Sequence, residues 1–455
     1  MGLDEQPGTR SVAPDATGAS SAGASAAAEL AVGFPEERRR SRYRWSICAL
    51  LFFATTVNYI DRQVMSLLAP TLQSNFGWTE AQYADIVSWW TFFYGAGMLF
   101  MGRIMDWIGT KKGFTISVLV WSLAAMSHAF MRTVTGFSIA RAALGLGESG
   151  NFPGAIKTVA EWFPKKERAL ATGIFNAGSN VGAVIAPLLV PAIALYMGWQ
   201  WAFIFTGCLD LIWLGFWLVI YRKPREHAKV TKAELEHIES DQEEPGERVP
   251  WLGLLKKRQT WAFIVGKFLT DPIWWFYLFW LPKFLDSEFG VTLSHLALPI
   301  IVIYVVADGG SVVGGWFSSA LISRGWSVNW GRKTAMLVAA LIIVPTMFTA
   351  HAKSMWVAVG IVSVAAAAHQ WWSANLFTTT SDMFPRRAVA SVVGIGGLAG
   401  AAGGFLFQRF TGYILQVTNS NYSVIFTMCG LAYVTAWVLI QLIVPRMQPA
   451  RLEEA

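Results

Sequence analysis

The sequence predicts an all-α membrane protein with twelve transmembrane helices in two six-helix repeats, and three observations support this fold class. Hydrophobic residues make up 54% of the 455 residues and charged residues only 14%, about half the charged share of soluble proteins. The apolar residues form runs of about 20 or more, long enough to cross a bilayer. Related motifs also recur in the two halves of the chain. A water-soluble enzyme is therefore excluded.

Charge and cysteine usage exclude further classes of protein. The formal net charge is +7, but the basic residues stand in clusters between apolar runs, so the expected partner is a lipid bilayer and not nucleic acid. Cys48, Cys208 and Cys429 lie far apart inside apolar runs, without the spacing of a zinc site or a disulfide framework. We expect no metal and no organic cofactor.

The apolar runs divide the chain into two bundles joined by a polar linker. The N-terminal tail is rich in Ala, Ser and Gly and is expected to be disordered, and the linker is expected to hold a short solvated helix after Thr231 and a break at Pro245-Gly246. The predicted units are a tail at 1–40, a bundle at 41–221, a linker at 222–258, a bundle at 259–445 and a tail at 446–455. Spans are expected at 45–69, 82–103, 113–132, 136–162, 168–195, 199–221, 259–285, 296–323, 333–350, 354–381, 387–415 and 421–445.

Basic residues predict the orientation of these spans. Cytoplasmic loops of membrane proteins carry an excess of Lys and Arg. With the arginine-rich N-terminus inside, the loops of that side hold nearly all of the basic clusters, so both termini are expected in the cytoplasm. The inner loops hold Lys111-Lys112, Lys165-Lys166, Arg222-Lys223, Lys256 to Arg258, Arg332-Lys333 and Arg386-Arg387, whereas the outer loops hold only Arg132, Lys283 and Lys353.

The two halves repeat one motif at the same place. Glu161-Trp-Phe-Pro-Lys-Lys166 ends the predicted fourth span, and Asp382-Met-Phe-Pro-Arg-Arg387 ends the tenth, 221 residues later. Because six is an even number, repeats in this register keep the same membrane orientation. They are then related by an axis along the membrane normal, as in a transporter with two similar halves around a central cavity.

Four charged residues inside the first and fourth spans predict an anion site. A charge near the bilayer centre costs about 2.5 to 3.5 kcal/mol on insertion scales. Arg62 and Arg141 are both expected about 12 Å from the outer ends of their helices, and arginines are fixed receptors for a carboxylate. Asp61 and Glu148 are buried carboxylates, whose proton affinity depends on burial and on nearby arginines. The alternative is that these four residues form salt bridges that only close a helix interface.

The predicted seventh span carries a second polar group. Lys267 and Asp271 are spaced i, i+4 and can form an intrahelical ion pair. Pro272 is expected to break or kink the helix. Trp274 and Trp275 fit either stacking on a sugar ring or an aromatic belt at the membrane surface.

Polar side chains on two other spans are candidates to read substrate hydroxyl groups. On the tenth span these are Gln370 and Asn375, whereas the neighbouring His369 is better explained as an interhelical hydrogen-bonding residue than as a proton relay. Asn180 on the fifth span, with Asn176 and Ser179, is expected to face the cavity. Asp308 has no evident partner.

Three motifs resemble those of a known family. The segment Gly102-x-x-x-Asp106-x-x-Gly109-Thr-Lys111 resembles the cytoplasmic loop signature of the major facilitator superfamily. Arg141-Ala-Ala-Leu-Gly-Leu-Gly-Glu148 resembles the fourth-helix motif of its anion:cation symporters, and Asn58-Tyr-Ile-Asp-Arg62 fits the same group. The run from Asp271 to Pro282 resembles bacterial hexuronate transporters in particular.

The resemblance implies the major facilitator fold and a location in the bacterial inner membrane. It also implies that the protein is a proton-coupled symporter, which imports a sugar acid, first of all a hexuronate, by alternating access. Alternatives are an aldonate or another organic anion such as galactonate, glucarate or an aromatic acid; a membrane-embedded transferase or a transporter-like sensor fits less well. No obligate protein partner is expected. It implies Asp61 and Glu148 as the protonatable pair, Tyr59, Arg62 and Tyr94 as substrate ligands, and Gly102, Asp106, Gly109 and Lys111 as gating residues.

Overall fold

The computed structural model describes residues 42–240 and 250–450, and all regular elements among them are helices. The predicted tail at 1–40 and the break at Pro245-Gly246 lie outside these residues. In the N-terminal half the helices are α2 (Tyr43–Leu67), α3 (Ala69–Phe76), α4 (Glu80–Ile108), α5 (Thr110–Ser127), α6 (Val134–Glu148), α7 (Asn151–Trp162), α8 (Lys165–Met197) and α9 (Trp199–Ile220). In the C-terminal half they are α12 (Arg258–Phe289), α13 (Ala297–Ser323), α14 (Val328–Ile343), α15 (Met355–Met383), α16 (Arg386–Val417) and α17 (Ser423–Ile443).

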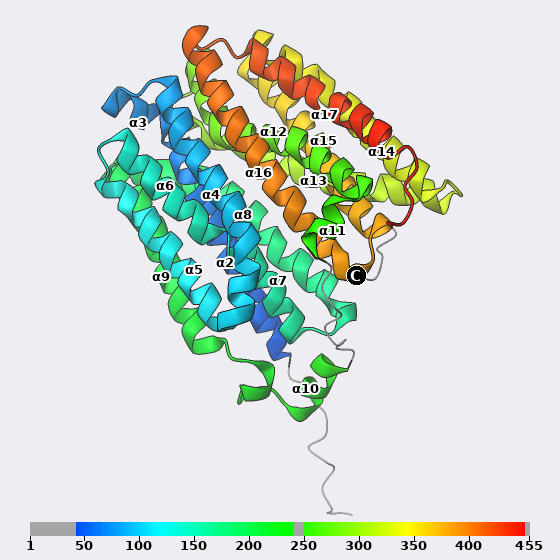
Figure 1. The fold of residues 1–455 in the computed structure, drawn as a ribbon. Coiled ribbons are helices and arrows are strands. Elements are labelled where there is room, and N and C mark those ends of the chain that lie inside the picture. The colour runs from blue at the N-terminus through cyan, green and yellow to red at the C-terminus, as the bar shows by residue number, and fades with distance from the viewer. Residues whose placement is uncertain (1–41, 241–249, 451–455) are drawn as a thin grey trace, which may run out of the picture.

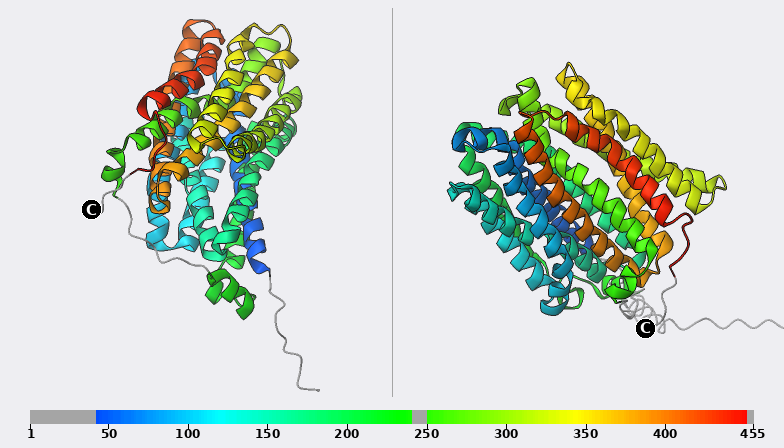
Figure 2. Two further views of the ribbon diagram at one scale, coloured as in Figure 1. Left: turned by 90° about the vertical axis from the view of Figure 1, so that its right-hand side faces the viewer. Right: turned by 45° about the horizontal axis from the view of Figure 1, so that its top comes forward.

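The helices form two bundles that lie side by side (Figure 1). Within the described residues, eight helical segments are long and apolar enough to span a membrane; α2, α4, α12 and the α6–α7 pair occupy the remaining four predicted spans and carry more polar residues. Two further views show the long helices running across the molecule in similar directions (Figure 2). The bundles meet where α4 packs on α16 and where α8 packs on α13. α4 and α13 are the second spans of the two repeats, and α8 and α16 are the fifth spans. Each contact therefore joins a second span to a fifth span, as the predicted axis requires.

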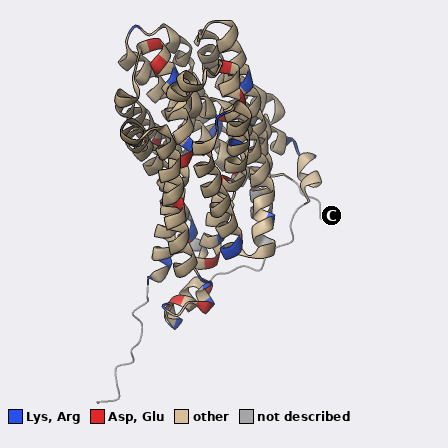
Figure 3. Cartoon of the chain, turned by 90° about the vertical axis from the view of Figure 1, so that its left-hand side faces the viewer, with Lys and Arg blue, Asp and Glu red and all other residues tan. Residues whose placement is uncertain are grey.

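Apolar and basic side chains are distributed over the surface as expected for a membrane protein. Large apolar side chains such as Val219, Val312 and Leu442 are mostly exposed on the outside of the bundle, which suits an apolar solvent. Much of the helix surface carries no charge, and basic residues gather near the linker (Figure 3). The three cysteines are free, as expected.

The predicted fourth span is two helices. The chain turns at Ser149 and Gly150, between α6 and α7. A side chain on Gly145 would meet the Trp90 carbonyl at 2.4 Å, and one on Gly147 would meet the Trp121 backbone at 2.6 Å. These glycines therefore let α6 approach α4 and α5 closely, which brings the end of α6 into the bundle interior.

Of the break or kink expected at Pro272, the break does not occur, because α12 is one helix from Arg258 to Phe289. Proline removes the N–H that would bond the Phe268 carbonyl. That carbonyl lies against Gly403 of α16, where an added side chain would meet it at 2.2 Å. Close packing of α16 thus covers the freed carbonyl without interrupting the helix.

The linker holds the predicted short helix, α10 (Lys232–Glu239), capped by the Thr231 hydroxyl, which accepts a hydrogen bond from the Glu234 N–H at 3.3 Å. Arg44 at the start of α2 contacts Glu234 at 3.2 Å and Glu167 at 2.8 Å. His237 of α10 lies 2.8 Å from Glu167. This cluster, called the linker clasp below, fixes α10 to the N-terminal bundle.

Candidate functional site

A central cavity of about 700 Å³ lies between the two bundles. It has a size typical of small-molecule sites. Both halves contribute polar side chains to its wall. The lining includes Tyr59, Arg62, Tyr94, Asn176, Ser179 and Asn180 from the N-terminal half and Lys267, Asp271, Trp274, Trp275, Asp308, His369, Gln370 and Ser373 from the C-terminal half.

One end of the cavity is closed. At the end near α3, which lies far from α10 in Figure 1, the Tyr83 hydroxyl donates to the Phe279 carbonyl at 2.6 Å, and Lys283 forms an ion pair with Glu80. Asp85 lies 2.9 Å from Arg409. These contacts all join α4 to α12 or α16. The two bundles are therefore joined at this end of the cavity.

Arg62 is the cationic centre of the cavity wall. Its Nε donates to Glu148 Oε2 at 3.2 Å and its Nη2 to Asn58 at 3.1 Å. The guanidinium also lies against a set of aromatic rings, at 4.4 to 5.9 Å from their centroids, where cation–π attraction stabilises it. These rings belong to Tyr59, Trp90, Tyr94 and Trp275.

Glu148 is buried behind Arg62 and is only half satisfied. Oε2 accepts bonds from Arg62 and from Trp90 Nε1, the latter at 3.1 Å. Oε1 is buried without a hydrogen-bond partner among the described residues. An acid proton on Oε1 would leave both bonds at Oε2 geometrically possible. Glu148 can therefore take up a proton on Oε1, and as a neutral acid it binds the Arg62 guanidinium more weakly than the carboxylate does.

Arg141 is fully buried, and none of its three nitrogens has a hydrogen-bond partner in the described structure. Its guanidinium lies 5.5 Å from the Phe279 ring and 5.9 Å from the Trp90 ring. The Phe279 carbonyl accepts the Tyr83 hydroxyl at the closed end. Arg141 is thus sealed from the cavity on the side where the bundles are shut.

Asp61 and Arg62 are neighbours on α2, and adjacent residues of a helix point about 100° apart. α2 packs on α9, whose Asp210 and Thr206 interact electrostatically with Asp61, and neither Asp61 oxygen has a hydrogen-bond partner among the described residues. Asp61, Arg141 and Glu148 do not line the cavity. Of the alternative salt bridges among these four residues, the described part of the chain contains one, between Arg62 and Glu148, whereas the side chains of Asp61 and Arg141 have no hydrogen-bond partner there.

The second polar group is present in the cavity. Lys267 and Asp271 form the predicted i, i+4 ion pair at 2.6 Å. Trp274 and Trp275 line the cavity, which excludes the aromatic-belt alternative. Trp275 Nε1 is buried without a partner among the described residues, and Trp274 stacks on His369 at 5.0 Å.

Of the two α15 side chains predicted to bind substrate hydroxyl groups, one lines the cavity and the other does not. Gln370 lines the cavity. Asn375 does not, because its amide donates to the Gly314 and Trp371 carbonyls at 3.1 and 3.0 Å and so ties α15 to α13. His369 is the predicted interhelical residue: its Nδ1 lies 2.5 Å from the Tyr433 hydroxyl of α17, although its ring also reaches the cavity wall.

The predicted gating residues lie near the end of α4, at the turn that follows it, and at the start of α5. Gly109 has a φ of +87°, a conformation that favours glycine. Lys111 Nζ donates to the Leu218 carbonyl at 2.8 Å and caps the end of α9. A side chain on Gly102 would meet no atom within 4 Å, and the side chain of Asp106 is outside the described structure.

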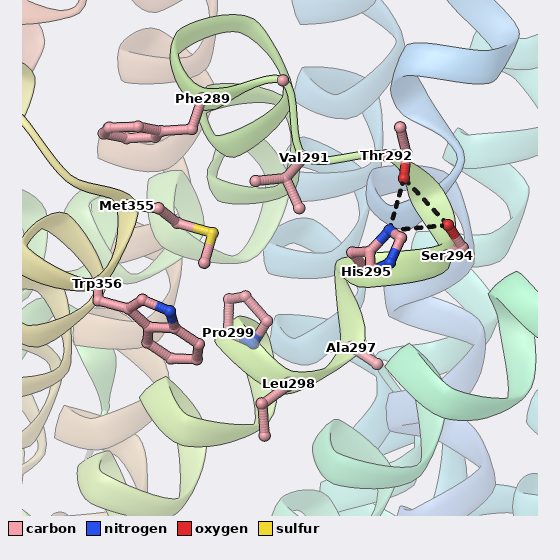
Figure 4. Close-up of a pocket in the computed structure, with 11 residues that line it drawn as sticks. Phe289, Val291, Thr292, Ser294, His295, Ala297, Leu298, Pro299, Met355 and Trp356 are labelled. Carbon is pink, nitrogen blue, oxygen red and sulfur yellow. Dashed lines mark hydrogen bonds between the residues drawn. The ribbon is translucent and has the colours of Figure 1, made fainter.

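A second cavity lies at the end near α3 (Figure 4). It measures about 560 Å³ and is lined mainly by apolar side chains such as Phe289, Leu298 and Trp356. Its titratable group, His295, is engaged at Nδ1 with Thr292 and Ser294 at 3.0 and 3.1 Å. This cavity lacks the buried arginine of the central one and is a poor anion site.

Sequence reasoning missed three residues of the site. Asp210 carries a visible signal, since it is a carboxylate inside an apolar span. Trp90 and Phe279 carry none, because aromatic residues are common throughout the membrane spans of this chain. Only the fold shows that they close over the arginines.

The two repeated bundles, the closed end and the polar central cavity define a multi-pass membrane transporter. The chain belongs to the Major Facilitator Superfamily, whose family model matches residues 51–408. It is 29% identical over 413 residues to the hexuronate transporter of Escherichia coli K12, covering 89% of this chain and 95% of that protein. It is 32% identical over 308 residues to the galacturonate transporter of Dickeya chrysanthemi, covering 66% of this chain and 89% of that protein.

Solved structures agree on the fold. A D-xylose–proton symporter superposes with a TM-score of 0.70 at 16% identity, covering 90% of this chain and all of that one. A bacterial homologue of the lysosomal transporter Spinster, in an inward-facing and occupied conformation, gives 0.69 at 18% identity, with coverage of 89% and 96%. With its family and with relatives that are named as transporters, the chain is a transporter and not an enzyme.

Proposed function

We propose that the protein is a proton-coupled symporter that imports a sugar acid anion, first of all a hexuronate such as glucuronate or galacturonate, across the bacterial inner membrane. The observation that carries the proposal is Arg62, a buried guanidinium at the wall of the cavity, held by a carboxylate that can be protonated. The names of the relatives, which include hexuronate, galacturonate and D-galactonate transporters, support the substrate class.

Competition for Arg62 provides the coupling. When Glu148 is ionised, it occupies Arg62; when it takes up a proton, the guanidinium can form a fork with the substrate carboxylate. A proton and an anion then enter together, and the buried site gains no net charge, which avoids the cost of an uncompensated charge in the membrane. The proton is the coupling ion, and no other cofactor takes part.

The remaining wall fits the rest of a sugar acid. Asn176, Asn180 and Gln370 offer donors and acceptors to several hydroxyl groups. The indole of Trp275 adds an unpaired buried N–H, and its ring beside Arg62 can stack on a sugar face. Arg141 would receive the anion when the end near α3 opens and Phe279 moves away. In this scheme both termini and the linker are cytoplasmic.

Uptake into proteoliposomes tests the proposal. Labelled glucuronate is offered with and without an inward proton gradient, and compared with gluconate, galactonate and an inward sodium gradient. We expect glucuronate uptake that rises with the proton gradient and collapses with a protonophore. Preference for galactonate would make the protein an aldonate transporter, and stimulation by sodium alone would overturn proton coupling.

A further inference from the structure

Asp308 of α13 is a carboxylate in the wall of the central cavity to which the coupling scheme gives no role. Its side chain is half-buried and lines the cavity. It forms no ion pair or hydrogen bond with any residue that the structure describes. A charge in the middle of a membrane span is costly and marks a functional position. Since the cavity is proposed to receive an anion, a free negative charge in its wall requires an explanation.

The other charged side chains of the cavity wall already have partners. Arg62 is held by Glu148 at 3.2 Å, and Lys267 is held by Asp271 at 2.6 Å. The ring of His369 binds a hydroxyl group of α17 through Nδ1 and is counted as neutral. Because the lysine and its partner cancel, the C-terminal half of the wall carries one unbalanced negative charge, on α13.

Two tryptophans of α12 connect this negative charge to the arginine of the other bundle. The ring of Trp275 lies 5.9 Å from the Arg62 guanidinium. Its neighbour Trp274 lies edge-on to Tyr304 of α13, also at 5.9 Å. Asp308 follows Tyr304 by one turn on the same face, about 6 Å along the helix. The guanidinium and the free carboxylate therefore line neighbouring parts of one cavity from opposite bundles.

We propose that Asp308 selects sugar acids with one carboxylate and rejects those with two. This inference rests on the proposed function. Glucuronate, a monoanion, places its carboxylate on Arg62 and its hydroxyl groups along the rest of the wall, where the Asp308 oxygens can accept hydrogen bonds from them. Glucarate has the same carbon chain with a second carboxylate in place of the aldehyde. Its second carboxylate would add a negative charge on the side of Asp308.

The wall offers no relief from this repulsion. Charges that are partly shielded from water by the cavity wall repel each other more strongly than charges in bulk solvent. Lys267 could bind the second carboxylate only by releasing Asp271, which would leave that acid unpaired. One proton on Glu148 balances one substrate charge, so a dianion would leave the site with an excess negative charge. A charge that repels the wrong ligand is a known means of specificity.

Calorimetry on the purified full-length protein tests the proposal with glucuronate and glucarate. We expect the wild type to bind glucuronate about tenfold or more tightly than glucarate. Asp308→Asn keeps the shape and an acceptor oxygen but removes the charge. Its affinity for glucarate should rise by about tenfold, while its affinity for glucuronate stays within about threefold of the wild type. Glu239→Gln, in the exposed linker pair with Arg225, should change neither affinity.

Two results would overturn the inference: equal binding of the two ligands by the wild type, or a fall of both affinities by one factor in Asp308→Asn, as a purely structural role predicts. Binding of neither ligand by the wild type is instead a failure of the proposed function.

A second measurement needs neither a substrate nor a folded Asp308→Asn protein. Ser311, which is exposed and lines the same cavity about one turn further along α13, can carry a thiol that reports the local charge. In Ser311→Cys, a cationic methanethiosulfonate should react several-fold faster than an anionic one, relative to their rates with a free thiol in solution. The wild type gives the background from the native cysteines. Equal relative rates would show that Asp308 does not repel anions and would overturn the inference.

Discussion

Arg62 and Glu148 are 86 residues apart in sequence, and their side chains meet at 3.2 Å between Nε and Oε2. The pair joins α2 to α6 at the wall of the central cavity, and both side chains are almost completely buried. Removing one partner of a buried ion pair leaves an uncompensated charge, which costs about 3 to 5 kcal/mol. A substrate carboxylate or a proton can prevent that cost, so this contact is where anion and proton binding become linked.

Glu148→Gln removes the acid but keeps the shape of the side chain. The amide can still accept bonds from Arg62 and Trp90, yet it cannot take up a proton. We expect proton-driven accumulation to fall to the level reached without a gradient, while counterflow exchange of labelled substrate stays measurable. The matched control is Glu239→Gln in the linker. Loss of all substrate binding in Glu148→Gln would contradict a role in coupling.

Arg62→Lys replaces a planar fork by a point charge. Hydrogen bonds to charged groups contribute about 1.5 to 3 kcal/mol, so substrate affinity should fall by about tenfold or more, measured by calorimetry on the purified protein. Arg225→Lys, in an exposed pair of the linker, should leave affinity unchanged. An unchanged affinity in Arg62→Lys would mean that Arg62 only holds α2 against α6.

Residue patterns predict the architecture of this protein better than they predict its site. Local sequence alone is enough to recognise the length of the spans and the basic loops between them. It also shows the repeated motif that contains Pro164 in one half and Pro385 in the other. Which arginine meets which acid depends instead on how α6 rotates against α2 and α4, and on glycines such as Gly145 that allow the close approach. Sequence therefore places Arg62 and Glu148 in the site but does not pair them.

Asn375 and Pro272 illustrate the same limit. An amide in the middle of a span must find partners, and sequence does not distinguish a substrate from the carbonyls of Gly314 and Trp371 that it contacts. Proline removes one helix hydrogen bond, and whether the helix then ends depends on what packs against the freed carbonyl, which here is Gly403 of α16. Both outcomes were decided by neighbours distant in the chain.

The linker clasp should loosen in acid. Burial alone would raise the pKa of Glu167, but hydrogen bonds from Arg44 and His237 outweigh it and hold the pKa below its usual value. A carboxyl group with a lowered pKa stabilises the folded protein at pH values above its pKa in the unfolded chain, near 4.3. This stabilisation is lost as the pH falls through the pKa of the group in the folded protein. In the wild type, backbone hydrogen exchange in α10, corrected for intrinsic rates, should accelerate below about pH 4 and stay slow at pH 6. In Glu167→Gln it should already be fast at pH 6. Equal protection at pH 6 in the variant would show that Glu167 does not hold α10.

Gly412→Leu should keep the cavity from closing at the end near α3. A Cβ on Gly412 would lie 2.2 Å from the Ala84 Cβ, so α16 and α4 cannot close as they do here. Overpacking of this kind costs about 1 to 3 kcal/mol, enough to shift the protein toward a state open at this end. Spin labels at the exposed positions Asn75 and Asn421 should move apart, and counterflow exchange should fall about tenfold or more. Gly309→Leu is the matched control, because a side chain there meets no atom within 4 Å; normal exchange in Gly412→Leu would show that this contact does not close the transporter.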